Sequence, residues 1–306
     1  MTTTTLILKI NNLTEQLNDY YELCKPRVVM LIVFTAIIGM FLATPGMVEF
    51  DILIFGSLGI GLAAASAAAI NQLVDRKVDA IMQRTSDRPL PTGHMTNKQA
   101  FIFAISLGLV AMFLLVQFIN LLTAALTFAS LIGYAVVYTM FLKRATPQNI
   151  VIGGAAGAAP PVLGWVAVTG TVDPNSLLLF LIIFAWTPPH FWALAIHRRD
   201  EYAKVDIPML PVTHGIKFTR LHVLLYTIIL LLVSLLPFMS GMSGIFYLIS
   251  AVILGLIFLV YAIKLHAGKD GKIAMQTFGF SIVYLMLIFS ALLIDHYSVS
   301  ILKIFA

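Results

Sequence analysis

An amide and two carboxylates recur at every fourth position near the start of residues 71–91, which read NQLVDRKVDAIMQRTSDRPLP. On a helix, Asn71, Asp75 and Asp79 would fall within an arc of about 80° and form one polar stripe, with about 6 Å of rise between neighbours. Oxygen ligands of this kind suit Mg²⁺, which keeps several waters and shares its shell with substrate phosphates. The spacing therefore predicts a magnesium site along one face of a helix.

Two arginines follow the stripe directly, at Arg84 and Arg88. Their planar guanidinium groups match the oxygens of a phosphate. Pro89 and Pro91 then stop any helix. The alternative for a charged stretch is an ordinary solvated loop, but acids at helical spacing followed by arginines favour a site for a metal-bound diphosphate.

The composition places these residues in a membrane protein. Of 306 residues, 60% are hydrophobic and 11% are charged, and the mean hydropathy is +0.96. A soluble domain of this length does not have such a composition. The net charge of +5 is spread over short loops, so no nucleic-acid partner is expected. The single cysteine, Cys24, excludes an intrachain disulfide and argues against a thiolate metal site.

Nine apolar segments can be counted, each near the ~20 residues that a bilayer requires. They predict an all-α bundle of nine transmembrane helices at about 28–44, 52–70, 100–118, 121–141, 150–168, 177–196, 221–239, 244–265 and 275–294. Residues 1–27 lack the features of a signal peptide and are expected to form a cytoplasmic N-terminal segment before a single transmembrane domain, 28–306. The fifth segment is rich in Gly, Ala and Pro, which predicts close helix packing and a break near Pro160 and Pro161.

The distribution of positive charge predicts the orientation. With the N-terminus in the cytoplasm, all of the 19 lysines and arginines except Lys303 lie on the cytoplasmic side. The loops that follow the second, fourth and sixth segments then share that face. They hold nearly all the candidate ligands, so we expect an active site at the cytoplasmic mouth of the bundle.

A second polar stretch ends the sixth segment, in WTPPHFWALAIHRRDEYAKVDIPMLPV. Pro188 and Pro189 are expected to kink this helix. Beyond them, Asp200 or Glu201 could bind a second Mg²⁺. The other candidates in this stretch are His190, Arg198, Arg199, Tyr202 and Lys204. A positively charged cytoplasmic loop without a binding role is an equal alternative for this stretch alone.

Further cations close the fourth segment and precede the first. Lys143 and Arg144 could serve only as topological anchors, but acids at the same depth favour a share in binding an anionic headgroup. Lys25 and Arg27 could assist from the N-terminal side.

The acid stripe with its trailing arginines resembles the first aspartate-rich motif of the UbiA superfamily of intramembrane prenyltransferases. More narrowly, the chain resembles the protoheme IX farnesyltransferase (heme O synthase) branch of that superfamily. The matching stretches, in order, are KPRVVMLIVFTAIIGMFLA, the stretch 71–91, YTMFLKRATPQNIVIGGAAGAAPPVLGWVAVTG and WTPPHFWALAIHRRDEYAKVDIPMLPVTHG. In one departure, the branch usually has Asp immediately before the tyrosine of the second motif, where this chain has Glu201. The choice between Asp200 and Glu201 as metal ligand therefore stays open.

The resemblance implies a UbiA-like bundle in a bacterial inner membrane and a Mg²⁺-dependent reaction. The farnesyl group of farnesyl diphosphate would be joined to a vinyl group of heme b, the acceptor substrate, with water adding as a hydroxyl, and heme O and diphosphate would be released. The metal would be held by Asn71, Asp75, Asp79 and the pair Asp200 and Glu201. The diphosphate would be held by Lys25, Arg27, Arg84, Arg88, Lys143, Arg144, Arg199 and Lys204, together with Asn71. A downstream heme-modifying enzyme or a terminal oxidase assembly is a possible partner.

Several roles and functions stay open. His190 could ligate heme iron or orient the substrate, or it could bond to a carbonyl freed by the prolines. Tyr138, Trp186, Phe191 and Trp192 could face an allylic cation or could only pack. The acid stripe alone also fits a prenyltransferase that acts on a quinone precursor or another aromatic acceptor. A transporter would place its ligands near the bilayer midplane, whereas these acids lie near one surface. A scaffold would not need the spacing.

Overall fold

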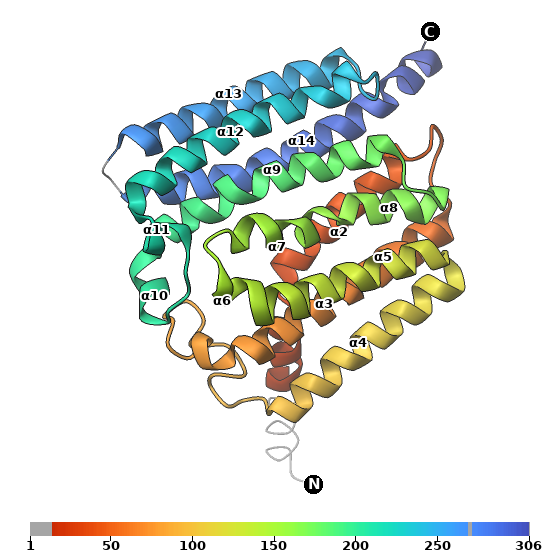
Figure 1. Ribbon diagram of the computed structural model, residues 1–306. Coiled ribbons are helices and arrows are strands. Elements are labelled where there is room, and N and C mark those ends of the chain that lie inside the picture. Colours follow the sequence, from red (N-terminus) through yellow and green to blue (C-terminus); the bar gives the residue numbers. More distant parts are fainter. Residues whose placement is uncertain (1–13, 269–270, 306) are drawn as a thin grey trace, which may run out of the picture.

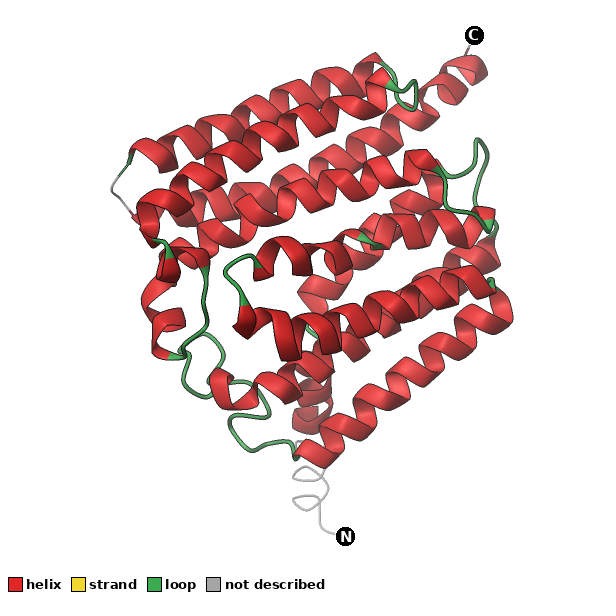
Figure 2. Cartoon of the chain, viewed as in Figure 1, coloured by secondary structure: helices red, strands yellow, loops and turns green. Residues whose placement is uncertain are grey.

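The computed structural model describes residues 14–268 and 271–305, with side chains described up to residue 298 (Figures 1 and 2). All regular structure within those ranges is helical. After a first helix, Thr14–Leu23, the elements are α2 (Pro26–Leu42), α3 (Phe50–Asp79), α4 (Asn97–Phe118), α5 (Leu121–Ile132), the π-helix η1 (Gly133–Leu142), α6 (Lys143–Ala145), α7 (Asn149–Ala158), α8 (Pro160–Thr169), α9 (Pro174–His197), α10 (Arg199–Lys204), α11 (Leu210–Thr213), α12 (Gly215–Met239), α13 (Ile245–Ala267) and α14 (Gly271–Phe305). Residues 1–13 of the expected N-terminal segment lie outside the described ranges.

The described helices confirm the predicted membrane bundle. Eight of them are long and apolar enough to cross a bilayer, and a ninth span is formed if α2 is taken with the helix before it. That pair, Thr14–Leu23 and α2, is bent by 53°. The bend falls at Lys25, which has a left-handed backbone (φ 51°, ψ 60°), and Pro26 then starts α2.

Helix α3 is much longer than its apolar part. It runs for 30 residues and ends at Asp79, so the acid stripe forms the last turns of the same helix that crosses the membrane. Its apolar half is rich in Gly and Ala, and α4 packs closely along it. For example, a Cβ on Gly59 would lie 2.6 Å from the side chain of Leu115. A capping box at Thr96 starts α4, which fixes the end of the connection between the two helices.

The fifth predicted span is divided, as its prolines indicate. Helix α7 ends at Ala158 and α8 begins at Pro160. The α8 half lies against α2 at very short range, since a Cβ on Gly164 would lie 2.0 Å from the carbonyl oxygen of Ala36. Glycine is required there because no side chain fits between the two backbones.

The sixth predicted span is a single helix that contains both prolines. Helix α9 runs without a break through Pro188 and Pro189. Both prolines are buried among α7, α12 and α14, so neighbouring helices support the backbone where the proline rings remove hydrogen bonds.

The ends of the helices converge at one end of the bundle. Figure 1 shows the connection between α3 and α4, the short helix α6 and the loop helices α10 and α11 at the same end. The two loops also share one hydrophobic cluster, in which Met82 after α3 is packed with Tyr202 and Ile207 after α9. The two loops therefore lie together at the same end of the bundle.

Candidate active site

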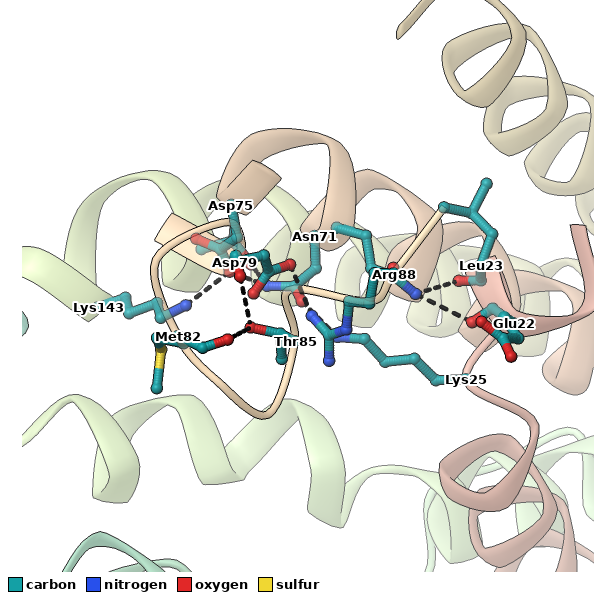
Figure 3. Close-up of polar contacts among 12 residues, drawn as sticks. Glu22, Leu23, Lys25, Asn71, Asp75, Asp79, Met82, Thr85, Arg88 and Lys143 are labelled. Atoms are coloured by element: carbon teal, nitrogen blue, oxygen red, sulfur yellow. Dashed lines mark hydrogen bonds and ion pairs between the residues drawn. The ribbon is translucent and has the colours of Figure 1, made fainter. Parts of the chain in front are cut away.

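The acid stripe on α3 is buried and its members contact one another. Asn71, Asp75 and Asp79 are each 5% exposed or less. The side-chain nitrogen of Asn71 donates to Asp75 Oδ2 at 3.0 Å, across one helical turn. Buried carboxylates require cationic or hydrogen-bonding partners, and other elements supply them (Figure 3).

The π-helix η1 brings the first partners. Lys143, which follows η1, places Nζ 2.6 Å from Asp75 Oδ2, and its side chain is only 14% exposed. Thr139 within η1 accepts a hydrogen bond from Asn71 Nδ2 at 3.2 Å and donates to the Tyr134 carbonyl at 2.8 Å. A π-helix widens the turn and often marks a functional site. Here it directs both Thr139 and Lys143 toward α3.

The N-terminal helix brings a second lysine. Lys25 Nζ donates to Asn71 Oδ1. The segment before Lys25 is fixed to α3 by Gln72, the residue after Asn71. Gln72 Nε2 donates to the carbonyls of Glu22 and Leu23, each at 3.0 Å. The left-handed backbone at Lys25 and the two bonds from Gln72 together hold the lysine over the stripe (Figure 3).

The loop after α3 folds back onto the last acid of the stripe. Arg88 Nη1 lies 2.6 Å from Asp79 Oδ2, with exposed side-chain fractions of 20% and 6%. Thr85 stabilises this return by donating its hydroxyl to the Asp79 carbonyl at 3.0 Å. Three cations, Lys25, Arg88 and Lys143, thus surround two buried acids and one amide. Such a group has the excess positive charge that a diphosphate would balance.

The two acids of the second predicted motif, Asp200 and Glu201, have different environments. Glu201 pairs with Arg198, and its Oε2 is buried without a hydrogen-bonding partner. The side chain of Asp200 is 88% exposed, and it contacts Arg199 at 3.4 Å. The structure therefore turns Glu201 inward and leaves Asp200 in solvent.

Tyr202 links the two motifs. It is buried in α10, and burial raises the pKa of its phenol. The charges of Arg84, Arg198 and Arg88 lie near enough to act in the opposite direction, while Glu201 adds to the increase. Because the charges of Arg84 and Arg88 in the loop after α3 and of Glu201 in α10 all act on Tyr202, this tyrosine lies between the two motifs.

The donor set fits a magnesium ion. Within residues 14–268 and 271–305, no three His, Cys, Asp or Glu side chains are gathered into a ready metal site. However, Asp75 Oδ1 is a buried carboxylate oxygen without a partner, as is Glu201 Oε2. Mg²⁺ commonly uses one or two carboxylates and completes its shell with water and substrate phosphate. Two unsatisfied carboxylate oxygens are consistent with that use.

Other predicted cations stand at the margin of this cluster. They are exposed, and the structure does not pair them with the acids of the stripe: Arg27, Arg84, Arg144, Arg199 and Lys204. Arg199 instead donates Nε to the Pro211 carbonyl at 3.1 Å and so supports the loop between α10 and α11.

His190 lies within α9, seven residues before its last residue, His197. Its ring is buried between the indole of Trp186, with a centroid distance of 4.2 Å, and the ring of Phe278 on α14, at 4.5 Å. Nδ1 lies 2.6 Å from Ser281 Oγ. The side chain is therefore directed toward α14 and does not bond to a carbonyl freed by the prolines.

Several residues of the site escape sequence reasoning. Gln72, Thr85 and Tyr134 take part in the site through hydrogen bonds to backbone carbonyls or through a π-helix. Residue type and spacing do not predict either feature. Ser281 lies on α14, for which the sequence predicts only an apolar transmembrane segment. Tyr134 and Tyr138 on η1 are four residues apart, and their rings stack at a centroid distance of 5.5 Å. This spacing is the sequence feature that could have indicated that Tyr134 belongs to the site.

Comparison with known proteins agrees with this geometry. The model of the UbiA prenyltransferase family matches residues 32–291. A protoheme IX farnesyltransferase of Methylococcus capsulatus is 66% identical over 280 residues, which are 92% of this chain and 94% of that protein. One from Nitrosococcus oceani is 58% identical over 297 residues, which are 97% and 98% of the two chains. The chain therefore belongs to the UbiA prenyltransferase family, and it is a multi-pass membrane prenyltransferase.

Solved structures share the fold at low sequence identity. A structure of digeranylgeranylglyceryl phosphate synthase matches with a TM-score of 0.78 at 20% identity, over 93% of this chain and 99% of that chain. A UbiA homologue of Archaeoglobus fulgidus bound to GPP and Mg²⁺ matches with a TM-score of 0.60 at 17% identity, over 90% and 99% of the two chains. These likenesses establish the UbiA fold.

Proposed function

We propose that this prenyltransferase transfers the farnesyl group of farnesyl diphosphate to a vinyl group of heme b. Water adds to the same vinyl group as a hydroxyl, and heme O and diphosphate are released. The observation that carries the proposal is the buried cluster of two acids, an amide and three cations at one end of the bundle. The acceptor is assigned from relatives named protoheme IX farnesyltransferase, which are 58–66% identical over at least 91% of the chain.

The metal and the diphosphate are assigned to the two convergent loops. Asn71, Asp75, Asp79 and Glu201 would hold Mg²⁺, and Asp200 is left out because it faces solvent. When bound, the metal stabilises negative charge on the leaving diphosphate oxygens. A UbiA homologue bound to GPP and Mg²⁺ supports this pairing of metal and prenyl diphosphate within the fold.

The cations act on the leaving group from three directions. Lys25, Lys143 and Arg88 come from the N-terminal segment, the end of η1 and the loop after α3. Fixed positive charges aimed at these oxygens lower the barrier to breaking the bond between the allylic carbon and oxygen. The exposed cations Arg27, Arg84, Arg144, Arg199 and Lys204 would attract the anionic substrate to this end of the bundle.

The acceptor is assigned to the interior of the bundle. Heme is a large apolar macrocycle, and the aromatic surface around His190 lies within α9 and α14. We assign His190 to the heme iron. Tyr202 stays neutral because burial raises its pKa, so it can donate a hydrogen bond at the junction of the two motifs.

The expected cellular setting follows from the same proposal. The site would open to the cytoplasm from a single transmembrane domain, 28–306, in a bacterial inner membrane. The cytoplasmic N-terminus is inferred from the distribution of lysine and arginine. Its product would be passed to a downstream heme-modifying enzyme or a terminal oxidase assembly.

The proposal is tested by product analysis. The purified protein is incubated with farnesyl diphosphate, heme b and Mg²⁺, and the extracted hemes are examined by mass spectrometry. The expected result is a heme whose mass has increased by one farnesyl group and one hydroxyl group. If heme b is unchanged while a quinone precursor is prenylated under the same conditions, the acceptor assignment is wrong.

A further inference from the structure

His190 is held in one plane by aromatic rings from two helices. Trp186 stacks on one face at an interplanar angle of 19°, and Phe278 stacks on the other at 26°. The Trp186 indole is itself fixed, because its Nε1 donates to the Ser281 carbonyl at 2.7 Å. The imidazole can therefore present only its edges to other groups.

Ser281 determines which ring nitrogen carries the proton. Its Oγ lies 2.6 Å from the Phe278 carbonyl oxygen and 2.6 Å from His190 Nδ1. The serine has one hydroxyl proton, and two oxygens at 2.6 Å need a proton between them. That proton is therefore donated to Phe278. Ser281 Oγ must then accept from His190, so Nδ1 carries a hydrogen.

The opposite edge of the ring is left with a lone pair. In a neutral imidazole with Nδ1–H, Nε2 is an acceptor. Among the residues that the structure describes, none donates a hydrogen bond to Nε2, although the side chain is only 7% exposed. Nε2 is also not one of the fully buried side-chain atoms that lack a partner, so its lone pair is accessible to a ligand. The residue lies about 10 Å along the helix axis from the end of α9, a depth suited to a ligand that enters from the bilayer.

We propose that Ser281 is a positioning residue that holds His190 as the neutral Nδ1–H tautomer, so that Nε2 coordinates the iron of the bound heme substrate. This inference rests on the proposed function, in which heme b is the acceptor. It extends the site to α14, outside both acidic motifs. Hydrogen bonds of this kind orient metal-binding histidines and raise their basicity.

The first test is a heme titration of the purified protein, monitored by absorption spectroscopy. The wild-type protein and Ser281→Thr, which keeps the hydroxyl, should show the same nitrogen-ligated spectrum. Ser281→Ala should weaken heme binding by about 10- to 100-fold, the usual effect of removing such a support. In turnover, Ser281→Ala should raise the KM for heme and leave the KM for farnesyl diphosphate unchanged.

Ser250→Ala is the matched control. Ser250 also donates its hydroxyl to a helix carbonyl, that of Phe246 at 2.9 Å, but it is half-buried on α13 and has no bond to His190 or Trp186. Its removal should change neither the spectrum nor the affinity. If Ser281→Ala matches the wild type in both, or if His190→Ala keeps the wild-type heme spectrum, the inference is overturned even when heme O is still formed.

The tautomer can be measured independently of activity. In protein with ¹⁵N-labelled imidazoles, the signals of His190 are identified by their loss in His190→Gln. The ligand-free wild type should show a protonated Nδ1 and a bare Nε2, and Ser281→Ala should lose this preference. A protonated Nε2 in the wild type would overturn the inference. Absence of any heme O from the wild-type enzyme would instead overturn the proposed function.

Discussion

Lys143 Nζ lies 2.6 Å from Asp75 Oδ2, and this contact joins the end of a π-helix to the middle of a buried acid stripe. The other oxygen of the same carboxylate, Oδ1, is buried without a partner. One side of Asp75 is therefore neutralised by a lysine, and the other is free for a metal. Under the proposed function, a substrate that carries both metal and diphosphate would satisfy both groups, since Lys143 would turn to the diphosphate while Asp75 would bind the metal.

Asp75→Asn and Asp79→Asn should each lower prenyl transfer by at least about 100-fold, because the metal loses a charged ligand that acts on the leaving group. The measurement is the rate of product formation in membranes with equal amounts of protein. Asp51→Asn is the control, since Asp51 is exposed in the first turn of the same helix, at its opposite end. Equal rates in all three variants would contradict the assignment.

Arg88→Ala should raise the KM for farnesyl diphosphate by about 10-fold or more, since a charge-assisted bond to an anion contributes roughly 1.5–3 kcal/mol. Arg76→Ala provides the comparison. Arg76 belongs to the last turns of α3, but its Nη1 donates to the Leu73 carbonyl and not to the acid stripe. A KM for Arg88→Ala that equals that of Arg76→Ala would show that Arg88 does not hold the diphosphate.

The two acids of the second motif should differ in effect. Glu201→Gln removes a carboxylate whose Oε2 is buried without a partner, and should raise the Mg²⁺ concentration needed for half-maximal activity by about 10-fold. Asp200→Asn changes a side chain that is 88% exposed and should leave the Mg²⁺ dependence unchanged. Magnesium titrations of the two variants check this. The reverse order of effects would place Asp200, and not Glu201, at the metal.

The contact between α2 and α8 should limit stability. Ala at position 164 or 39 would place a Cβ 2.0 Å or 2.2 Å from a backbone oxygen of the facing helix. We expect Gly164→Ala and Gly39→Ala each to cost about 1–3 kcal/mol by forcing the helices apart. Thermal unfolding in detergent measures this. Gly279→Ala, where a Cβ meets nothing within 4 Å, should be neutral or slightly stabilising. Unchanged unfolding of the first two variants would contradict the close packing.

Local spacing predicts the parts of the site that lie on one element. The stripe of Asn71, Asp75 and Asp79 follows from helical periodicity, and the division of the fifth span follows from Pro160. The two loops were also expected to lie on the same face of the membrane, because four predicted spans, an even number, separate them. What spacing cannot show is how a side chain turns once helices pack.

The remaining features depend on packing between distant elements. Asp200 and Glu201 are adjacent and chemically alike, so their spacing does not show that Glu201 is turned inward and Asp200 is exposed. The position of Lys25 depends on a bend and on two bonds from Gln72. Pro188 and Pro189 do not break α9, because three neighbouring helices support it. The bond between Ser281 and His190 joins residues 91 positions apart.

The most direct measurement of the central claim is the electron spin resonance of bound Mn²⁺, used in place of Mg²⁺, with a non-reactive thiolo analogue of farnesyl diphosphate. In the wild-type protein, the Mn²⁺ signal should show magnetic coupling to phosphorus, and this coupling should be lost when Asp75 and Asp79 are both changed to Asn. Mn²⁺ bound without phosphorus coupling in the wild type, or coupling that persists in the double variant, would contradict a metal-bridged diphosphate held by these acids.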